Sequence, residues 1–119
     1  MNILLTTPKP EELKEFVTGL KQESCHPVLA ENGEKTLDLI SSAKPGLVIV
    51  DDRLPDYGAL TLIREIVTRD AMINTAVITG MDDSEFHEKS EGLGVFMKLP
   101  LKPQAQDARE LIQNLKKII

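Results

Sequence analysis

Short apolar runs alternate with amphipathic segments along the whole chain, and this alternation predicts the order of the secondary structure. Five runs are short and lack helical periodicity, so we expect strands at residues 2–6, 26–30, 46–50, 75–79 and 95–99. The run "GLVIV" at 46–50 has no polar position, as in parallel strands that are covered on both faces. Pro27 lacks a backbone N–H and therefore favours an edge position for the strand at 26–30.

Five further segments place apolar residues three or four positions apart, which predicts amphipathic helices at 10–22, 33–43, 59–69, 83–92 and 104–119. Pro10 and two glutamates lie in the first turn of the first helix, as is typical of helix starts. The segment 83–92 is mostly polar and predicts only a weak helix. We expect these side chains to face the core: Leu13, Phe16, Val17, Leu20, Leu37, Ile40, Leu60, Ile63, Ile66, Val67, Ala108, Leu111, Ile112 and Leu115.

This order of elements indicates a single α/β domain that spans residues 1–119. Short connections between alternating strands and helices imply right-handed crossovers, and hence a three-layer (βα)5 doubly wound parallel sheet. Sites in such sheets lie beyond the carboxyl ends of the strands. The residues at these ends are Thr6 and Thr7, Asp51 and Asp52, Thr79 and Gly80, and Lys98 and Leu99.

Composition and charge narrow the possible functions. The net charge is −5 and no basic run is longer than two lysines, which argues against direct binding to nucleic acid or to an anionic membrane. No stretch is long enough to span a bilayer, and the N-terminus lacks a signal-peptide pattern. The lone Cys25 cannot form an internal disulfide, which fits a cytoplasmic location. Cys25 and His26 are adjacent and make a poor zinc chelate.

The stretch "LVIVDDRLPDYG" at 47–58 runs from a buried strand directly into Asp51 and Asp52, and Asp56 follows a proline. Adjacent carboxylates at this edge of a sheet suit a site that handles phosphate and a divalent metal ion. A polar turn explains them too, because aspartate is common in turns. Taken alone, the residues favour the turn without excluding the site, and Asp56 is most simply a turn residue.

The stretch "AENGEKTLDLISSAKPGLVIVDDRLPDYGALTLIREI" at 30–66 resembles the receiver domain of bacterial two-component response regulators. It has an Asn-Gly pair that opens the second helix, then Lys-Pro and an apolar strand that ends in an aspartate. Pro55 lies four residues after Asp51, so Asp51 matches the family's phosphoacceptor. "TAVITG" resembles the fourth strand, and "GLGVFMKLP" resembles the fifth, with Phe96 at its aromatic position. The resemblance implies a flavodoxin-like sheet with strand order 2-1-3-4-5.

The resemblance also implies phosphorelay signalling rather than enzyme activity. A sensor histidine kinase or phosphotransfer protein would phosphorylate Asp51, whose carboxylate would lie in a shallow pocket close to the Thr79 hydroxyl. Thr79 and Phe96 would form a switch that signals through the fourth helix, fifth strand and fifth helix. The recipient would be a downstream protein, an output domain or a second copy in a homodimer. Mg²⁺ would bind Asp51, Asp52 and the backbone carbonyl of Arg53.

Two departures from the family pattern weaken this chemistry. The family's first strand ends in an acidic pair that holds the cation, whereas this chain has Thr6 and Thr7, so we expect only a weak Mg²⁺ site. The family's lysine before the proline after the fifth strand is Leu99 here. Lys98 points away from the site if the strand alternates regularly, and Lys102 is the candidate that reaches back.

These departures leave a second interpretation open, that of a pseudo-receiver, which binds a partner protein without being phosphorylated. A third interpretation, an enzyme or cofactor binder on a flavodoxin-like sheet, is disfavoured because no glycine-rich loop follows a strand: "TTPKP" is proline-rich and "TGMDDSE" is acidic. The sequence also leaves open whether the chain acts alone or belongs to a longer regulator.

Overall fold

The computed structural model describes residues 1–119, and at its centre is a parallel five-stranded sheet. The strands are β1 (Ile3–Thr6), β2 (Val28–Ala30), β3 (Leu47–Asp51), β4 (Asn74–Ile78) and β5 (Met97–Leu99). They lie in the order β2-β1-β3-β4-β5 and every neighbouring pair is parallel, which confirms the predicted topology. β2 is an edge strand, as Pro27 indicated.

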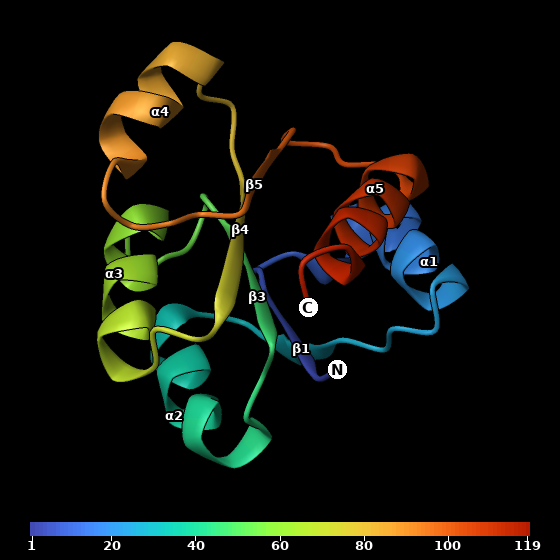
Figure 1. Cartoon of the computed structure of the whole chain (residues 1–119), viewed down its shortest axis with the longest axis horizontal. Coiled ribbons are helices and arrows are strands. Elements are labelled where there is room, and N and C mark those ends of the chain that lie inside the picture. The colour runs from blue at the N-terminus through green and yellow to red at the C-terminus, as the bar shows by residue number, and fades with distance from the viewer.

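Helices cover both faces of the sheet, so the molecule has three layers (Figure 1). α1 (Lys14–Gln22) and α5 (Ala105–Lys116) lie on one face, and α2 (Gly33–Ala43), α3 (Ala59–Arg69) and α4 (Asp83–Ser90) lie on the other. Alternate strand residues enter the two cores. Ile49 and Ile78 pack with α1 and α5, whereas Val48 and Val77 pack on the α2 and α3 side.

The helix predicted at 10–22 is split into two elements. A 3₁₀ helix, η1 (Pro10–Leu13), precedes α1, and Leu13 leaves the helical region with φ −111° and ψ 21°. The predicted bounds of α2 and α3 agree with the structure, whereas α4 and α5 end earlier than predicted, at Ser90 and Lys116. The 3₁₀ turn matters for function because it carries Glu12 to the carboxyl edge of the sheet.

Most of the predicted core positions are buried, including all four in α5. Four predicted core residues are only partly buried: Val17, Leu37, Leu60 and Val67. Leu62, which the helical pattern did not single out, is fully buried. Apart from Phe16, the fully buried side chains of the two cores are aliphatic, in keeping with the low aromatic content.

α1 and α5 approach each other closely at Gly19. A Cβ atom at this position would lie 2.4 Å from the backbone oxygen of Ala105 and 2.8 Å from the Cβ of Ala108. Only glycine fits such a contact, because real Cβ atoms do not approach other heavy atoms so closely. Gly19 therefore sets the spacing of the helix pair on this face of the sheet.

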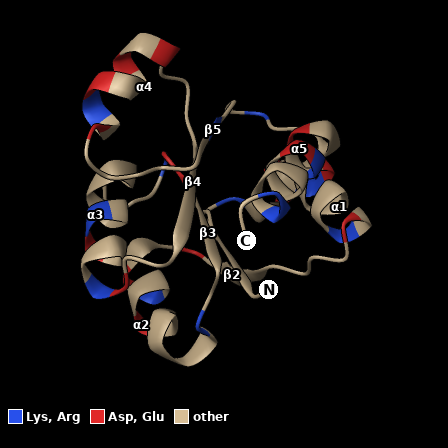
Figure 2. Cartoon of the chain, viewed as in Figure 1, with Lys and Arg blue, Asp and Glu red and all other residues tan.

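α4 is the least integrated helix. It has no buried residue, and Figure 2 shows bands of both charge signs along it. This agrees with the weak, polar helix that the sequence predicted. None of the helices in the molecule has both the length and the apolar character needed to cross a bilayer.

Candidate functional site

The candidate site lies where β1 and β3 end side by side. After β1 the chain turns back to form β2 at the edge, whereas β3 lies on the opposite side of β1, so this is the point where the strand order reverses. Ligand sites of doubly wound sheets form at such points. Thr7 directly follows β1, and Asp51 is the last residue of β3. The register pairs Thr6 with Val50, which places Thr7 beside Asp51.

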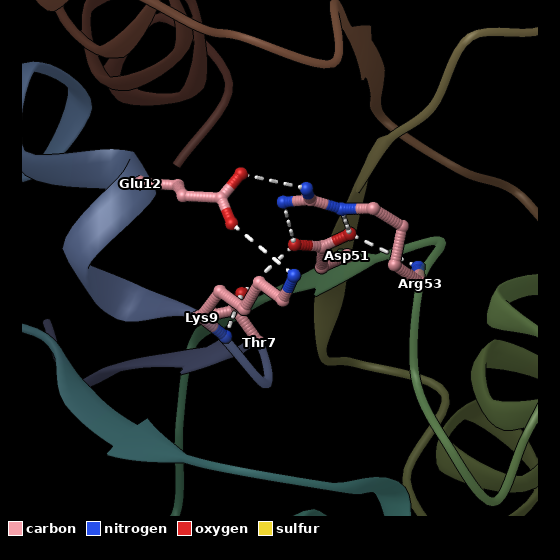
Figure 3. A network of polar contacts seen from close by, with 5 residues as sticks. All are labelled: Thr7, Lys9, Glu12, Asp51 and Arg53. Atoms are coloured by element: carbon pink, nitrogen blue, oxygen red, sulfur yellow. Dashed lines mark hydrogen bonds and ion pairs between the residues drawn. The ribbon is translucent and has the colours of Figure 1, made fainter.

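Asp51 is fully buried, with 0% of its surface exposed, and both of its carboxylate oxygens are occupied. Oδ2 accepts hydrogen bonds from Thr7 Oγ1 at 2.8 Å and from Arg53 Nη2 at 2.9 Å. Oδ1 accepts from the Arg53 backbone N–H at 3.0 Å and from Arg53 Nε at 3.1 Å. The guanidinium thus binds the carboxylate through two parallel bonds, the strongest geometry for this pair (Figure 3).

Arg53 is held in turn by the loop that follows β1. Its Nη1 donates to Glu12 Oε1 at 3.0 Å, and Lys9 Nζ lies 3.7 Å from the other Glu12 oxygen. The Lys9 backbone N–H donates to the Thr7 hydroxyl at 3.2 Å. Negative and positive charges therefore alternate from Asp51 through Arg53 and Glu12 to Lys9 (Figure 3). In this network the Arg53 guanidinium lies between the carboxylates of Asp51 and Glu12.

The network fixes the charge of Asp51. Burial raises the pKa of its carboxyl group, but the hydrogen bonds from Arg53 and Thr7 outweigh burial and hold the pKa below its ordinary value. The same pairing with Asp51 and Glu12 raises the pKa of Arg53. At neutral pH the site therefore contains a carboxylate that is already neutralised by a cation from its own loop.

Thr79 makes no hydrogen bond to Asp51, contrary to the prediction that its hydroxyl lies close to that carboxylate. Its hydroxyl donates to Asp52 Oδ2 at 2.8 Å and accepts from the Met81 backbone N–H at 3.1 Å. The register explains this, because Asp51 pairs with Ile78 and the next residues along each strand, Asp52 and Thr79, are neighbours. Residues that pair in register share a face of the sheet, so Asp51 and Thr79 belong to different faces.

The position of the missing lysine is occupied by a core residue. Leu99 pairs in register with Ile78, so its side chain lies on the face of Asp51, and it is fully buried against α1 and α5. Lys98 points to the other face, as predicted, where its Nζ bonds the Met81 carbonyl at 3.0 Å and Asp83 at 2.7 Å. Lys102 is exposed and its side chain makes no hydrogen bond or ion pair.

Phe96 lies just before β5 and is partly buried against the core between the sheet and α1 and α5. Its backbone N–H donates to the Thr75 carbonyl at 2.8 Å. The two residues of the predicted switch therefore make separate contacts: Thr79 bonds Asp52 and Met81, and Phe96 packs, partly buried, on the α1 and α5 side of the sheet.

Sequence reasoning considered Arg53 only for its backbone carbonyl and missed its side chain. A cation two residues after the aspartate, together with the loss of both acidic partners, was the available signal. It also treated Asp56 as an ordinary turn residue. In the structure the Asp56 carboxylate accepts the backbone N–H groups of Gly33 and Glu34, both at 3.0 Å, and so caps α2.

The strand order and the aspartate that ends β3 together define a receiver-like α/β domain. The chain belongs to the response regulator receiver domain family, since the model of that family matches residues 3–116. This confirms the resemblance seen in the sequence and the role in two-component signal transduction that the family implies.

Relatives and solved structures agree with this assignment. A protein-glutamate methylesterase/protein-glutamine glutaminase of Paramagnetospirillum magneticum is 31% identical over 84 residues, which make up 69% of this chain and 22% of that protein. The positive alginate biosynthesis regulatory protein of Pseudomonas aeruginosa is 31% identical over 86 residues, 70% of this chain and 35% of that protein. The chain thus spans about a fifth to a third of the length of these relatives.

Two solved structures show the fold at full coverage. The receiver domain of NtrX from Brucella abortus has a TM-score of 0.85 and 18% identity, and the match covers 98% of this chain and 99% of that one. A two-component response regulator from Clostridium difficile has a TM-score of 0.85 and 16% identity, with 99% and 97% covered. At these identities the likeness establishes the fold alone.

The Mg²⁺ ion that the family implies does not fit the donor atoms of this site. The Thr6 hydroxyl is hydrogen-bonded to the Thr36 hydroxyl, and the Thr7 hydroxyl donates a hydrogen bond to Asp51. Both Asp51 oxygens are bonded, and no three acidic, histidine or cysteine side chains gather around one point. A hard cation prefers an octahedron of free oxygen ligands, whereas here a guanidinium fills the space beside the carboxylate.

Proposed function

We propose that this receiver domain is a pseudo-receiver, a protein-interaction module that works without phosphorylation of Asp51. The observation that supports this is the two-fold hydrogen bond between the Arg53 guanidinium and the fully buried Asp51 carboxylate. In this role the domain binds a partner protein through its surface, and the Asp51 carboxylate serves to hold the loop after β3. We propose no enzymatic activity for the domain.

The chemistry of phosphoryl transfer supports this reading. The acceptor oxygen must approach the phosphorus atom in line, and positive groups must offset the charge of the transferring phosphoryl group. At Asp51 each oxygen already accepts two hydrogen bonds, so attack would first require Arg53 or Thr7 to withdraw. The family's lysine has no direct replacement, because Leu99 is apolar and Lys98 is paired with Asp83; the unpaired Lys102 lies in the exposed segment after β5.

A phosphorylatable receiver is the second candidate. Arg53 favours it, because its side chain is 36% exposed and a long flexible arm can release the carboxylate and then pair with a phosphoryl group. In this role a sensor histidine kinase or phosphotransfer protein would transfer a phosphoryl group to Asp51. Thr79 or Lys102 would then donate hydrogen bonds to the phosphoryl oxygens. Phe96 and the α4–β5–α5 face would then carry the signal to a downstream protein or output domain.

An amide NMR experiment on the 119-residue chain separates the two candidates. The spectrum is recorded before and after addition of acetyl phosphate and excess MgCl₂, for the natural chain, Asp51→Asn and Asp52→Asn. The pseudo-receiver predicts the same spectrum before and after in all three proteins. Shifts that extend from residue 51 to Thr79 and Phe96, present in Asp52→Asn and lost in Asp51→Asn, would establish the phosphorylatable receiver instead.

A further inference from the structure

The edge strand β2 presents apolar side chains to solvent. Val28 is 47% exposed and Leu29 is 50% exposed, although a free strand edge is usually protected by charged residues or a covering loop. The sheet has no strand beyond β2. This edge is thus available for pairing with a further strand.

The backbone N–H and C=O groups of Leu29 are free to pair with a further strand. The Ala30 carbonyl accepts from the Thr7 N–H at 2.9 Å, so the polar groups of Ala30 face β1. In a parallel ladder successive residues turn their N–H and C=O groups to opposite sides. Those of Leu29 therefore face away from β1, and they offer one donor and one acceptor to an added strand.

A groove runs beside this edge. A cavity of about 420 Å³ lies between α1 and β2, and a second of about 290 Å³ adjoins it toward Thr7, with Pro10 and Leu29 lining both. We call the two together the edge groove. The Leu29 side chain and Val17 of α1 form apolar parts of its wall.

The α1 side of the edge groove is basic. Lys14, Val17, Thr18 and Lys21 follow one another at helical spacing along it, and His26 lies across from them. No aspartate or glutamate lines the larger cavity, whereas Glu31 lines the smaller one, where it pairs with Lys35 at 3.8 Å. Neither Lys14 nor Lys21 takes part in an ion pair. Unpaired basic side chains around an apolar centre are notable in a chain of net charge −5.

We infer that the edge groove binds an extended acidic segment of a partner protein, which adds to the sheet beside β2. The segment has the pattern acidic–x–apolar–x–acidic. Its central apolar side chain enters the groove between Val17 and Leu29, and its backbone pairs with Leu29. Its two carboxylates bind Lys14 and Lys21.

The spacing fits this pattern. Lys14 and Lys21 are seven residues apart on a helix, which corresponds to about 10 Å. Side chains at positions i and i+4 of a strand point the same way and lie about 13 Å apart, a difference that lysine side chains can span. The inference rests on the proposed interaction role, for which it names a partner chemistry, but it does not involve Asp51.

The test uses the 119-residue chain and a fluorescein-labelled peptide with a Glu-Thr-Val-Thr-Glu core; a second peptide has lysines in place of both glutamates. We expect saturable binding of the acidic peptide only, with the largest amide shifts at Leu29 and along α1. Lys14→Glu with Lys21→Glu weakens binding about tenfold or more, since two attractive pairs become repulsive. The matched control, Lys116→Glu with Lys117→Glu, makes the same charge change at the end of α5 and leaves the affinity unchanged.

Leu29→Ser is a milder variant at an exposed position, and it weakens binding while the amide spectrum remains that of the folded chain. Equal binding of the two peptides, equal affinity of the two double variants, or no shift at Leu29 would overturn the inference. So would a dimer that Leu29→Ser dissociates, or binding to phosphatidylserine vesicles in place of the peptide. None of these outcomes bears on Asp51, so a failure here is distinct from a failure of the proposed function.

Discussion

Arg53 donates three hydrogen bonds to the carboxylate of Asp51, two from its guanidinium and one from its backbone N–H. The two residues are separated by one position, so the contact forms within a single turn at the end of β3. A charge that is left in the interior without a partner is strongly unfavourable, and this local pair removes that penalty. The acidic edge of the fold thus contains its own counter-ion.

Removing the guanidinium should destabilise the domain. Breaking a buried ion pair costs about 3–5 kcal/mol, but Arg53 is one-third exposed and water will reach Asp51, so we expect Arg53→Ala to lose about 2 kcal/mol. Urea unfolding at pH 7 measures this loss. The matched control is Arg69→Ala, whose pair with Glu65 is exposed and should cost under about 0.5 kcal/mol. Equal losses of unfolding free energy in the two variants would show that the Asp51–Arg53 pair stabilises the fold no more than an exposed ion pair does.

The Asp51 pair also predicts the pH dependence of stability. The folded pKa of Asp51 lies below its unfolded value of about 3.9, so the pair stabilises the fold at all pH values above this and the contribution is lost as pH falls through the folded pKa. Asp51→Asn should therefore show a shallower fall in unfolding free energy between about pH 5 and pH 2. Asp38→Asn, which removes an exposed carboxylate that makes no hydrogen bond or ion pair, should keep the slope of the natural chain.

Magnesium should leave the natural chain unchanged, because both carboxylate oxygens of Asp51 are already bonded and the Asp52 carboxylate is paired with Thr79 instead of facing the same point. We expect no change in melting temperature at about 10 mM MgCl₂, a concentration that would detect even millimolar affinity by linkage. The double variant Thr7→Asp with Arg53→Ala restores one carboxylate and removes the competing cation. We expect MgCl₂ to raise its melting temperature by several degrees. In a control with Thr18→Asp in place of Thr7→Asp, MgCl₂ should not raise the melting temperature. A magnesium-dependent rise in the natural chain would show that the donor atoms rearrange.

The contact between α1 and α5 at Gly19 predicts a stability change far from the site. Alanine is the better helix former by about 1 kcal/mol, but its methyl group would overlap Ala105 and force the helices apart. We expect Gly19→Ala to lose about 1–3 kcal/mol in thermal or urea unfolding, the range for overpacked cores. At Gly58 the nearest atom to an added Cβ is 3.6 Å away, so Gly58→Ala should cost less than about 1 kcal/mol. A neutral Gly19→Ala would mean that the helix pair is loosely packed.

The fold could be predicted because its signals are local or repeat along the chain. Helices α2 and α3 were predicted to the residue, since Asn32 and Gly58 mark their starts and their apolar spacing is regular. Strand bounds differed by one or two residues, because an apolar run does not show where hydrogen bonding to a neighbouring strand stops. The helix predicted at 10–22 is two elements in the structure because the backbone of Leu13 leaves the helical region. No pattern of residues in the sequence predicts this break.

The site was predicted less completely because its contacts depend on register and side-chain direction. The sequence places Asp51 and Thr79 at adjacent strand ends, but a shift of one residue decides which aspartate the Thr79 hydroxyl meets. Arg53 lies in a turn, where the direction of a side chain does not follow from periodicity. Its partner Glu12 is 41 residues away, and only the folded chain brings the two together.

The central claim is that Arg53 keeps Asp51 out of phosphoryl transfer, and intact-mass measurement tests it most directly. The 119-residue chain and its variants Asp51→Asn and Arg53→Ala are each incubated with acetyl phosphate and saturating MgCl₂, and their intact masses are measured under conditions that preserve acyl phosphates. The account predicts no phosphoryl adduct on the natural chain. An adduct on the natural chain that is absent from Asp51→Asn would contradict it and would establish Asp51 as a working phosphoacceptor.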